Sequence, residues 1–140
     1  MRPSAPTDAS TGDLLMQVGR GLRRAYLDAL APWQVTPGQA RALGTICAHA
    51  PVRLSALADL LTIVPRSATQ VVDALEAQGL VARQPDPDDR RATCVVATPE
   101  GERLHEEFHR ARSRESERYF AVLSERDRAE LERILRLLVD

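Results

Sequence analysis

We predict a mainly α fold of the α+β class: a winged helix-turn-helix with a two-stranded wing and with dimerisation helices at its N- and C-terminal ends. Three observations lead to this prediction. Residues 54–79 hold two short helical patterns joined by a tight turn. Residues 80–97 hold two short β-prone segments around a turn rich in Pro and Asp. Amphipathic helical patterns before and after this region fill nearly half of the 140 residues.

The N-terminal third of the chain predicts a tail and two helices. Residues 1–12 are rich in Pro, Ser, Ala and Thr, and we expect a disordered tail there. Apolar residues recur every three or four positions over residues 14–30, which predicts an amphipathic helix that Pro32 stops. The Thr-Pro-Gly-Gln sequence at 36–39 combines a capping Thr, a Pro at the first helical position and the Gln of a capping box. We therefore expect a second helix that runs to about His49.

Two short helices are predicted within residues 54–79. Ser55 is expected to cap the first, and Pro65 to open the second, which ends where Gly79 can adopt a left-handed conformation. The apolar residues on the inward face of the second helix are Ala68, Val71, Val72 and Leu75. The polar residues on its opposite face are Arg66, Thr69, Gln70 and Asp73. That polar face is suited to a DNA groove.

A hairpin and two more helices complete the pattern. Residues 80–84 and 92–97 are short and β-prone, and the Pro and Asp residues between them favour a turn. The Thr-Pro sequence at 98–99 is expected to start a long helix. Ser124 with Asp127 is expected to cap a last helix.

The composition indicates one domain over residues 13–140, in the cytoplasm. We expect residues 35–98 to form the DNA-binding part, and residues 13–31 and 99–140 to form the dimerisation helices. No apolar run approaches the roughly 20 residues that span a bilayer, and the N-terminus lacks the apolar segment of a signal peptide. We therefore expect no membrane partner.

The chain has less positive charge than most DNA-binding proteins, because such proteins usually carry a basic surface. The net charge is −1. The arginines between residues 62 and 97 are Arg66, Arg83, Arg90 and Arg91. The acids in the same segment are Asp73, Glu76, Asp86, Asp88 and Asp89. Any positive face must therefore arise from geometry and dimer symmetry.

The helices outside the winged unit carry apolar stripes that need a partner. A two-fold homodimer with interleaved terminal helices would cover them, and symmetric pairs are the commonest soluble assemblies. Two copies of the helix that starts at Pro65 could then enter successive major grooves about 34 Å apart. The predicted partners are a second copy of the chain and double-stranded DNA with a near-palindromic site.

The sequence resembles the MarR family of transcriptional regulators over essentially everything after the tail. The matching segments are VTPGQARAL at 35–43, LADLL at 57–61, PRSATQVVDALEAQGLVAR at 65–83 and DPDDRRATCVVATPEG at 86–101. The resemblance implies a dimeric regulator, usually a repressor. Such a protein leaves its operator when a small phenolic, aromatic carboxylate or lipophilic molecule binds between its dimerisation and DNA-binding parts.

The helix that starts at Pro65 carries four candidate DNA contacts. Arg66 and Gln70 are expected to contact bases or phosphates, and Ser67 and Thr69 to position the DNA backbone. The chain departs from the family pattern at Val64, which cannot cap the helix with its side chain. It also has Gln70 where a basic residue is frequent, and Gln favours adenine over guanine.

The wing tip carries three more candidate DNA-binding residues: Asp89, Arg90 and Arg91. The resemblance assigns Arg91 to the minor groove, with Asp89 suited to orient a guanidinium. Minor-groove insertion of Arg is physically reasonable, because narrow A·T-rich grooves concentrate negative potential.

The resemblance also implies a ligand pocket among the first, second and fifth predicted helices. The candidate lining residues are Tyr26, Trp33, Arg41 and Phe108. An apolar wall with one cation would suit an aromatic carboxylate or a phenolate, so a small-molecule effector is expected. The alternative interpretation of the aromatic residues is core and dimer packing.

Two cysteines and two histidines leave a thiol- or metal-responsive regulator as an alternative. Cys47 and Cys94 lack the spacing of a zinc site or a disulfide framework, so we expect free, buried thiols. His105 and His109 share one helix face, but a third metal ligand is missing. We expect two exposed histidines, no metal and no cofactor.

The sequence carries no motif of an enzyme: it has no glycine-rich phosphate loop, no nucleophile motif and no clustered acid-base pair. A further alternative is a winged helix that serves as a protein-interaction or structural module without a specific operator, because a fold does not fix a function.

Overall fold

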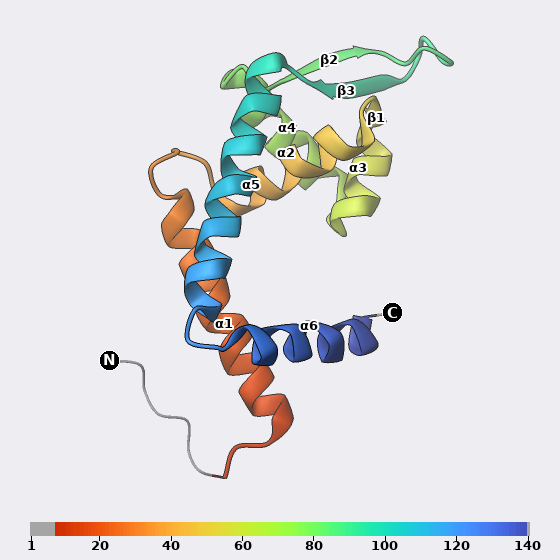
Figure 1. Cartoon of the computed structure of the whole chain (residues 1–140). Helices are drawn as coiled ribbons and strands as arrows, with labels where there is room; N and C mark the ends of the chain where they lie inside the picture. The colour runs from red at the N-terminus through yellow and green to blue at the C-terminus, as the bar shows by residue number, and fades with distance from the viewer. Residues whose placement is uncertain (1–7, 140) are drawn as a thin grey trace. The chain divides into compact units, whose positions relative to one another are not determined.

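The computed structural model describes residues 8–139 of the chain. In this range it has six helices and three strands (Figure 1). In chain order they are α1 (Thr11–Leu30), α2 (Pro37–His49), β1 (Val52–Arg53), α3 (Leu54–Leu61), α4 (Pro65–Ala77), β2 (Val81–Pro85), β3 (Thr93–Ala97), α5 (Pro99–Phe120) and α6 (Glu125–Val139). The predicted mainly helical fold with a small antiparallel sheet is confirmed.

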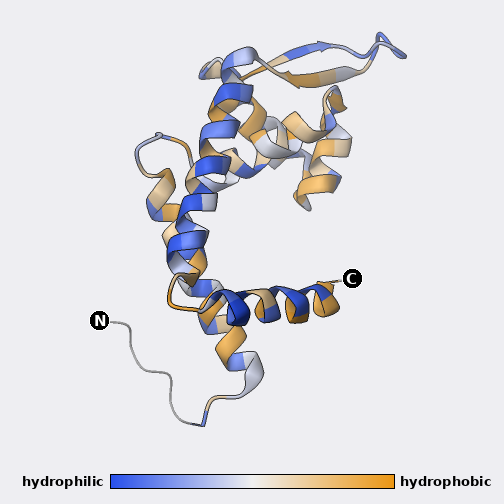
Figure 2. Cartoon of the chain, viewed as in Figure 1, coloured by the Kyte–Doolittle hydropathy of each residue, from blue (hydrophilic) through white to orange (hydrophobic). Residues whose placement is uncertain are grey.

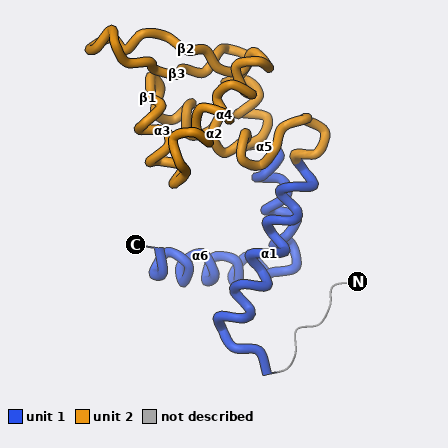
Figure 3. The backbone as a smooth tube through the Cα atoms, turned by 180° about the vertical axis from the view of Figure 1, so that it is seen from behind, with its two compact units in different colours: residues 1–29, 111–140 blue, residues 30–110 orange. Residues whose placement is uncertain are grey.

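The described residues form two compact units (Figure 3). One unit spans residues 30–110 and contains α2, α3, α4, the three strands and the first half of α5. The other contains α1 up to Ala29, the second half of α5 from Ala111 and all of α6. Within residues 8–139, no helix combines the length and the apolarity that a membrane crossing requires.

The unit of residues 30–110 is built on one apolar core. α2, α3 and α4 pack against one another, and each of them also contacts the sheet. The largest side chains that are completely buried in this core are Leu43, Ile46, Leu57, Val72, Leu75, Val81 and Val95. Because these residues come from three helices and two strands, the core fixes α4 relative to the hairpin.

The sheet has the strand order β1-β3-β2, with both pairs antiparallel. Val81 lies opposite Ala97 and Pro85 opposite Thr93, so β2 and β3 form the predicted hairpin. The third strand, β1, was missed by the sequence reasoning. Its residue Val52 pairs with Val95, which lies more than forty positions further along the chain. A two-residue strand has no periodicity of its own, and only its distant partner defines it.

Two helix ends predicted from local sequence are confirmed. The Thr36 side chain accepts a hydrogen bond from Gln39 N (3.1 Å), and the Gln39 side chain accepts one from Thr36 N (3.3 Å), which completes a capping box at the start of α2. At the end of α4, Gly79 has φ 74°, and Leu80 N donates to Leu75 O (3.0 Å). This is the Schellman arrangement, which needs a residue that tolerates positive φ.

The predicted starts of the last two helices are also confirmed. The Thr98 hydroxyl donates to Gly79 O (2.7 Å) and accepts from Gly101 N (3.1 Å), so it both caps α5 and ties it to the end of α4. Ser124 Oγ accepts from Asp127 N (3.1 Å) and donates to its carboxylate (2.8 Å). Each cap satisfies backbone donors that a helix start leaves free.

Two other helix starts differ from the prediction. α3 begins at Leu54 with Arg53 as its N-cap, and Ser55 lies inside its first turn, so the predicted Ser55 cap is wrong. The pairing of β1 with β3 ends at Arg53 and sets this start. α1 begins at Thr11 rather than after the predicted tail of residues 1–12, because Ser10 and Asp13 cap it reciprocally. The rest of that tail prediction, residues 1–7, lies outside the described residues.

The second unit is held by packing between α1 and the end of α5. Tyr119 of α5 donates from its hydroxyl to Val18 O of α1 (3.3 Å) and lies against Gly21, where an added Cβ would be 2.5 Å from the Tyr119 hydroxyl. Large apolar residues of this unit are nevertheless exposed, and Figure 2 shows orange bands along α1 and α6, where most of them lie. They are Leu14, Leu15, Met16, Val18, Leu27, Val122, Ile134, Leu137, Leu138 and Val139.

Candidate nucleic-acid interface

α4 presents one polar face and buries the other, as its sequence pattern predicts. The buried face consists of Ala68, Val72 and Leu75, each with no exposed surface, together with half-buried Val71. The exposed residues of the other face include Arg66, Thr69, Gln70 and Asp73. Ser67 is half-buried. The core contacts therefore hold the polar face outward.

The side chains on this face differ in how far they are already engaged. The Thr69 hydroxyl donates to Pro65 O (3.2 Å), the preceding turn of its own helix. The side chains of Arg66 and Gln70 make no hydrogen bond or ion pair with any residue in 8–139, and both are exposed. Their donors are therefore available to bases or phosphates.

Arg83 of β2 clamps the hairpin to α4. Its Nη2 lies 2.5 Å from the Asp73 carboxylate and its Nη1 lies 2.9 Å from that of Glu76. The backbone N–H of Arg83 also donates to Glu76 (3.1 Å). The hydrogen bond to Asp73 is the largest cause that raises the pKa of Arg83, so the guanidinium stays charged. The sequence reasoning counted Arg83 only as a charge and missed this role.

Asp86 anchors the base of the hairpin loop. It is 6% exposed, and its carboxylate accepts a hydrogen bond from the backbone N–H of Asp88 (2.8 Å) and forms an ion pair with Arg53 of β1. These two interactions, the Asp88 bond first, lower the pKa of Asp86. The sequence reasoning missed this buried carboxylate as well. No local signal marks it, because Arg53 lies 33 positions away.

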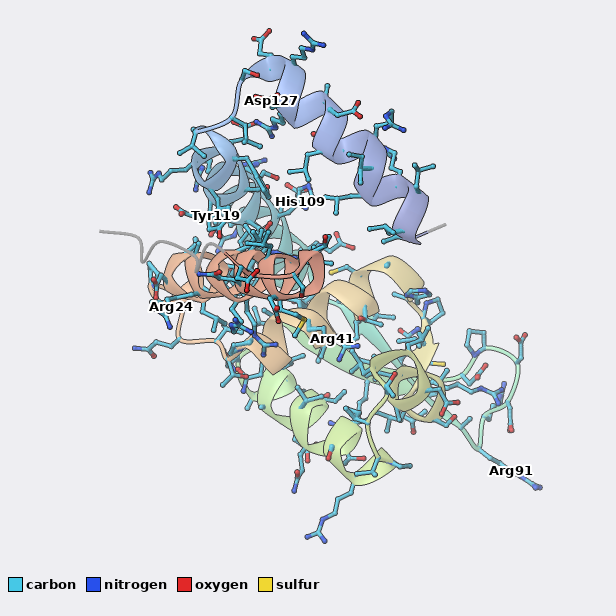
Figure 4. All side chains as sticks on the ribbon, turned by 90° about the horizontal axis from the view of Figure 1, so that it is seen from below. Arg24, Arg41, Arg91, His109, Tyr119 and Asp127 are labelled. Carbon is cyan, nitrogen blue, oxygen red and sulfur yellow. The ribbon has the colours of Figure 1, made fainter. Side chains whose placement is uncertain are left out.

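The hairpin tip exposes Arg90 and Arg91. The Asp89 carboxylate accepts a hydrogen bond from the backbone N–H of Arg91 (3.0 Å), and Asp89 O accepts one from Ala92 N (3.0 Å). Asp89 therefore shapes the turn through the backbone. Figure 4 shows the Arg91 side chain extending away from the hairpin tip. Neither arginine forms an ion pair with another residue of the described range.

The ion pairs determine which charged side chains of the winged part remain available to DNA. Arg83 forms ion pairs with both Asp73 and Glu76, and Arg53 forms one with Asp86. In residues 62–97 the unpaired arginines are Arg66, Arg90 and Arg91, and the acids without an ion pair are Asp88 and Asp89. The unpaired arginines lie at the start of α4 and at the hairpin tip, so the available positive charge is concentrated where a DNA contact is predicted.

The predicted pocket residues lie in both units. Trp33 and Phe108 make an edge-to-face contact with ring centroids 5.3 Å apart, and the Trp33 Nε1 donates to Glu107 (3.1 Å). Arg41 Nη1 donates to Leu61 O at the end of α3 (3.0 Å). Tyr26 belongs to the other unit, where the Arg112 guanidinium lies 4.9 Å from its ring centroid. An open hollow of about 460 Å³ is lined by other residues, namely His105, Glu106, His109 and Arg110.

The cysteines are both free thiols. Cys94 is buried as predicted, whereas Cys47 is only half-buried, so the prediction of a buried thiol is wrong there. Burial raises the pKa of both thiols, with Glu102 adding to the rise at Cys47 and Asp86 at Cys94. A raised pKa lowers the thiolate fraction and with it the reactivity towards oxidants.

The histidines also differ from the prediction of two exposed side chains. His109 is exposed, but His105 is half-buried against α2, where a Cβ added at Gly44 would lie 3.1 Å from its ring. The absence of a Cβ at Gly44 makes this packing possible. Among residues 8–139, no group of three or more His, Cys, Asp and Glu side chains is arranged to hold a metal ion.

Comparisons with known proteins agree on one family. A family model for the MarR family matches residues 35–93. The putative transcriptional regulatory protein for the hcr operon of Thauera aromatica is 30% identical over 135 residues, which cover 91% of this chain and 81% of that protein. The transcriptional repressor NicR of Pseudomonas putida is 30% identical over 144 residues, which cover 98% of this chain and 91% of NicR. A crystal structure of a mutant MarR from E. coli shares the fold, with a TM-score of 0.86 at 24% identity over 96% of this chain and all of the other.

Proposed function

The chain belongs to the MarR family of transcriptional regulators, and we propose that it is a repressor that binds a near-palindromic operator as a homodimer and leaves it when a small ligand binds. Its DNA-binding part is the winged helix, and the family consists of regulators rather than enzymes. Under this proposal residues 35–98 contact DNA, and residues 13–31 and 99–140 make the dimer.

The observation that carries the proposal is the position of the unpaired arginines. Arg66 stands at the second residue of α4, and Arg90 and Arg91 stand at the hairpin tip. α4 would lie in the major groove, with Arg66 and Gln70 at base edges or phosphates. Ser67 and Thr69 would contact the DNA backbone, and Arg91 would reach the adjacent minor groove, with Arg90 beside it.

The exposed apolar side chains of α1 and α6 support the dimer. Leu137, Leu138 and Val139 are each about 70–80% exposed, and Met16 is 62% exposed. Contiguous exposed apolar residues of this size usually mark an interface. A second copy of the same helices is the simplest partner, because symmetric contact covers both surfaces at once.

Release by a ligand is proposed for a small molecule with an aromatic ring and an acidic group. Within the unit of residues 30–110 the candidate contacts are Trp33, Arg41 and Phe108, and Arg41 supplies the cation. Arg41 also holds the end of α3 through Leu61 O, so an anion that competes for its guanidinium would act on the element that precedes α4. The relative NicR is a repressor by name, which supports repression over activation.

The test is binding to duplex DNA from upstream of the chain's own gene, followed by fluorescence anisotropy at several salt concentrations. We expect sequence-specific binding that Arg91→Ala weakens, most strongly at low salt, because fewer counterions are released. Two arginines are lost per dimer, so the slope of log affinity against log salt should become shallower by about 2. Benzoate and phenol serve as ligand probes in the same assay, and release by either supports a ligand response.

Arg110→Ala is the matched control, because Arg110 is an exposed arginine on α5 rather than on α4 or the hairpin. It removes the same charge and should leave the slope unchanged. An Arg91→Ala variant with wild-type affinity and slope would remove Arg91 from the interface. Binding that is equally strong to unrelated DNA would instead favour a winged helix that acts as a protein-interaction module.

A further inference from the structure

We propose that Val64 recognises thymine in the operator through contact between its methyl groups and the C5-methyl group of the base. This inference rests on the proposed function, because it assigns a base preference to the same interface. The starting observation is that Val64 is 62% exposed although it directly precedes α4. An apolar side chain is therefore exposed at the start of α4.

The turn between α3 and α4 directs Val64 outward. Thr62 adopts a left-handed conformation with φ 55°, and Ile63 after it packs against the core. Val64 is extended, with φ −70° and ψ 151°. Successive side chains of an extended segment point to opposite sides. The burial of Ile63 therefore fixes the exposure of Val64.

Helix stability favours a different residue at this position. Val64 is the N-cap of α4, and its side chain makes no capping hydrogen bond. Ser, Thr, Asp and Asn are preferred at an N-cap because their oxygen accepts a hydrogen bond from the first turn. The Pro65 that follows restricts Val64 to extended backbone, which suits a β-branched residue. Threonine has the same branch and would also cap, so backbone preference does not explain a valine.

The surroundings of Val64 identify DNA as the partner. Arg66, two residues further on, is exposed and has no ion-pair partner within residues 8–139, so an anion is expected beside Val64. The N-terminal residues of a recognition helix are those that reach base edges in the major groove. Thymine is the base that presents a methyl group there, and contact with that methyl is an established form of base readout. An apolar protein partner would leave Arg66 unpaired in the interface.

The test is a double-variant cycle in which the methyl groups are removed from the protein, from the DNA, or from both. The full chain and its Val64→Ser variant are titrated with the operator duplex and with the same duplex in which deoxyuridine replaces thymine. Deoxyuridine lacks only the C5-methyl group. We expect the wild-type chain to lose about fourfold in affinity for each contacted methyl group. Val64→Ser should bind both duplexes equally, and its melting temperature should rise because serine caps α4.

Three outcomes would overturn the inference. The first is equal binding of both duplexes by the wild-type chain. The second is an unchanged loss on the uracil duplex in Val64→Ser. The third is a loss that disappears in Leu60→Ser instead, since Leu60 on α3 is the neighbouring exposed apolar residue, at 44%. Each leaves the proposed function intact because the operator is still bound. Only the absence of sequence-specific binding by the wild-type chain would contradict the proposed function itself.

Discussion

Replacing Arg83 with methionine should weaken DNA binding although the Arg83 guanidinium is already occupied within the protein. In the wild-type chain this group forms ion pairs with Asp73 and Glu76. Asp73 lies three residues after Gln70 and so shares its face of α4. Methionine keeps most of the apolar stem of arginine but removes the charge. The carboxylates of Asp73 and Glu76 would then lose their neighbouring positive charge beside the expected path of the DNA.

The effect on stability should be small. The Asp73 side chain is 60% exposed and that of Glu76 is 43% exposed, so solvent screens both ion pairs. Pairs of this kind contribute about 0.2–1 kcal/mol each. The free energy of unfolding should therefore fall by roughly 1 kcal/mol, and the chain should remain folded at room temperature.

The effect on DNA affinity should be similar in size and should depend on salt. An unpaired carboxylate at about 10 Å from a phosphate is repelled by roughly 0.4 kcal/mol in water. One positive charge removed from each protomer of a dimer then costs about 0.8 kcal/mol, which corresponds to a loss of roughly fourfold in affinity at low salt. The loss should shrink at higher salt, because the Debye length falls to about 8 Å at 0.15 M.

Anisotropy titrations at 50 and 200 mM salt, with melting curves of the same samples, measure both effects. The rescue variant combines Arg83→Met with Asp73→Asn and Glu76→Gln, and it should recover all of the lost affinity because no carboxylate of the cluster remains. Wild-type affinity of the Arg83→Met variant at 50 mM salt would refute the electrostatic argument. A rescue variant as weak as the single one would show that movement of the hairpin, and not charge, causes the loss.

Two further predictions concern the supports of the interface. The backbone N–H of Asp88 holds the pKa of Asp86 below its ordinary value of 3.8, so the stability that Asp86 contributes is present above about pH 4 and is lost as the pH falls through its lowered pKa. Urea unfolding should show wild type more stable than Asp86→Asn at pH 7, with a difference that narrows as the pH falls below 4; a constant difference would contradict this. Gly101→Ala would place a Cβ 2.9 Å from the carbonyl carbon of Leu80, and the urea midpoint should fall by an amount equivalent to about 3 kcal/mol. Gly19→Ala, with no atom within 4 Å of the added Cβ, should be neutral or stabilising, and equal effects of the two changes would refute the steric argument.

The helix ends that could be predicted from the sequence are those that neighbouring residues determine. The capping box at Thr36, the left-handed Gly79 and the Thr98 cap all involve groups within a few positions, so short patterns reveal them. The polar face of α4 follows equally from helical periodicity. These local signals gave the fold class and most of the candidate interface residues.

The features that the sequence did not reveal depend on contacts between distant residues. β1 exists because Val52 meets Val95, and α3 starts at Leu54 instead of after Ser55 because that strand ends there. The Arg53–Asp86 pair joins residues 33 positions apart. Local propensity carries no information about such pairs, since a two-residue strand and a single carboxylate have no pattern. The residues that contact DNA stay a prediction, because their exposure alone does not test it.

The internal ion pairs explain how a chain of net charge −1 can bind DNA selectively. Three acids of the winged part form ion pairs with Arg53 and Arg83, and the arginines that remain unpaired stand where the groove is expected. Three such arginines in each protomer give six in a dimer, which limits their part of the salt slope to about −5. Because that electrostatic contribution is the same for every sequence and modest in size, arbitrary DNA should be bound weakly. Discrimination among sequences must then come from base contacts of α4 and from groove shape at the hairpin tip.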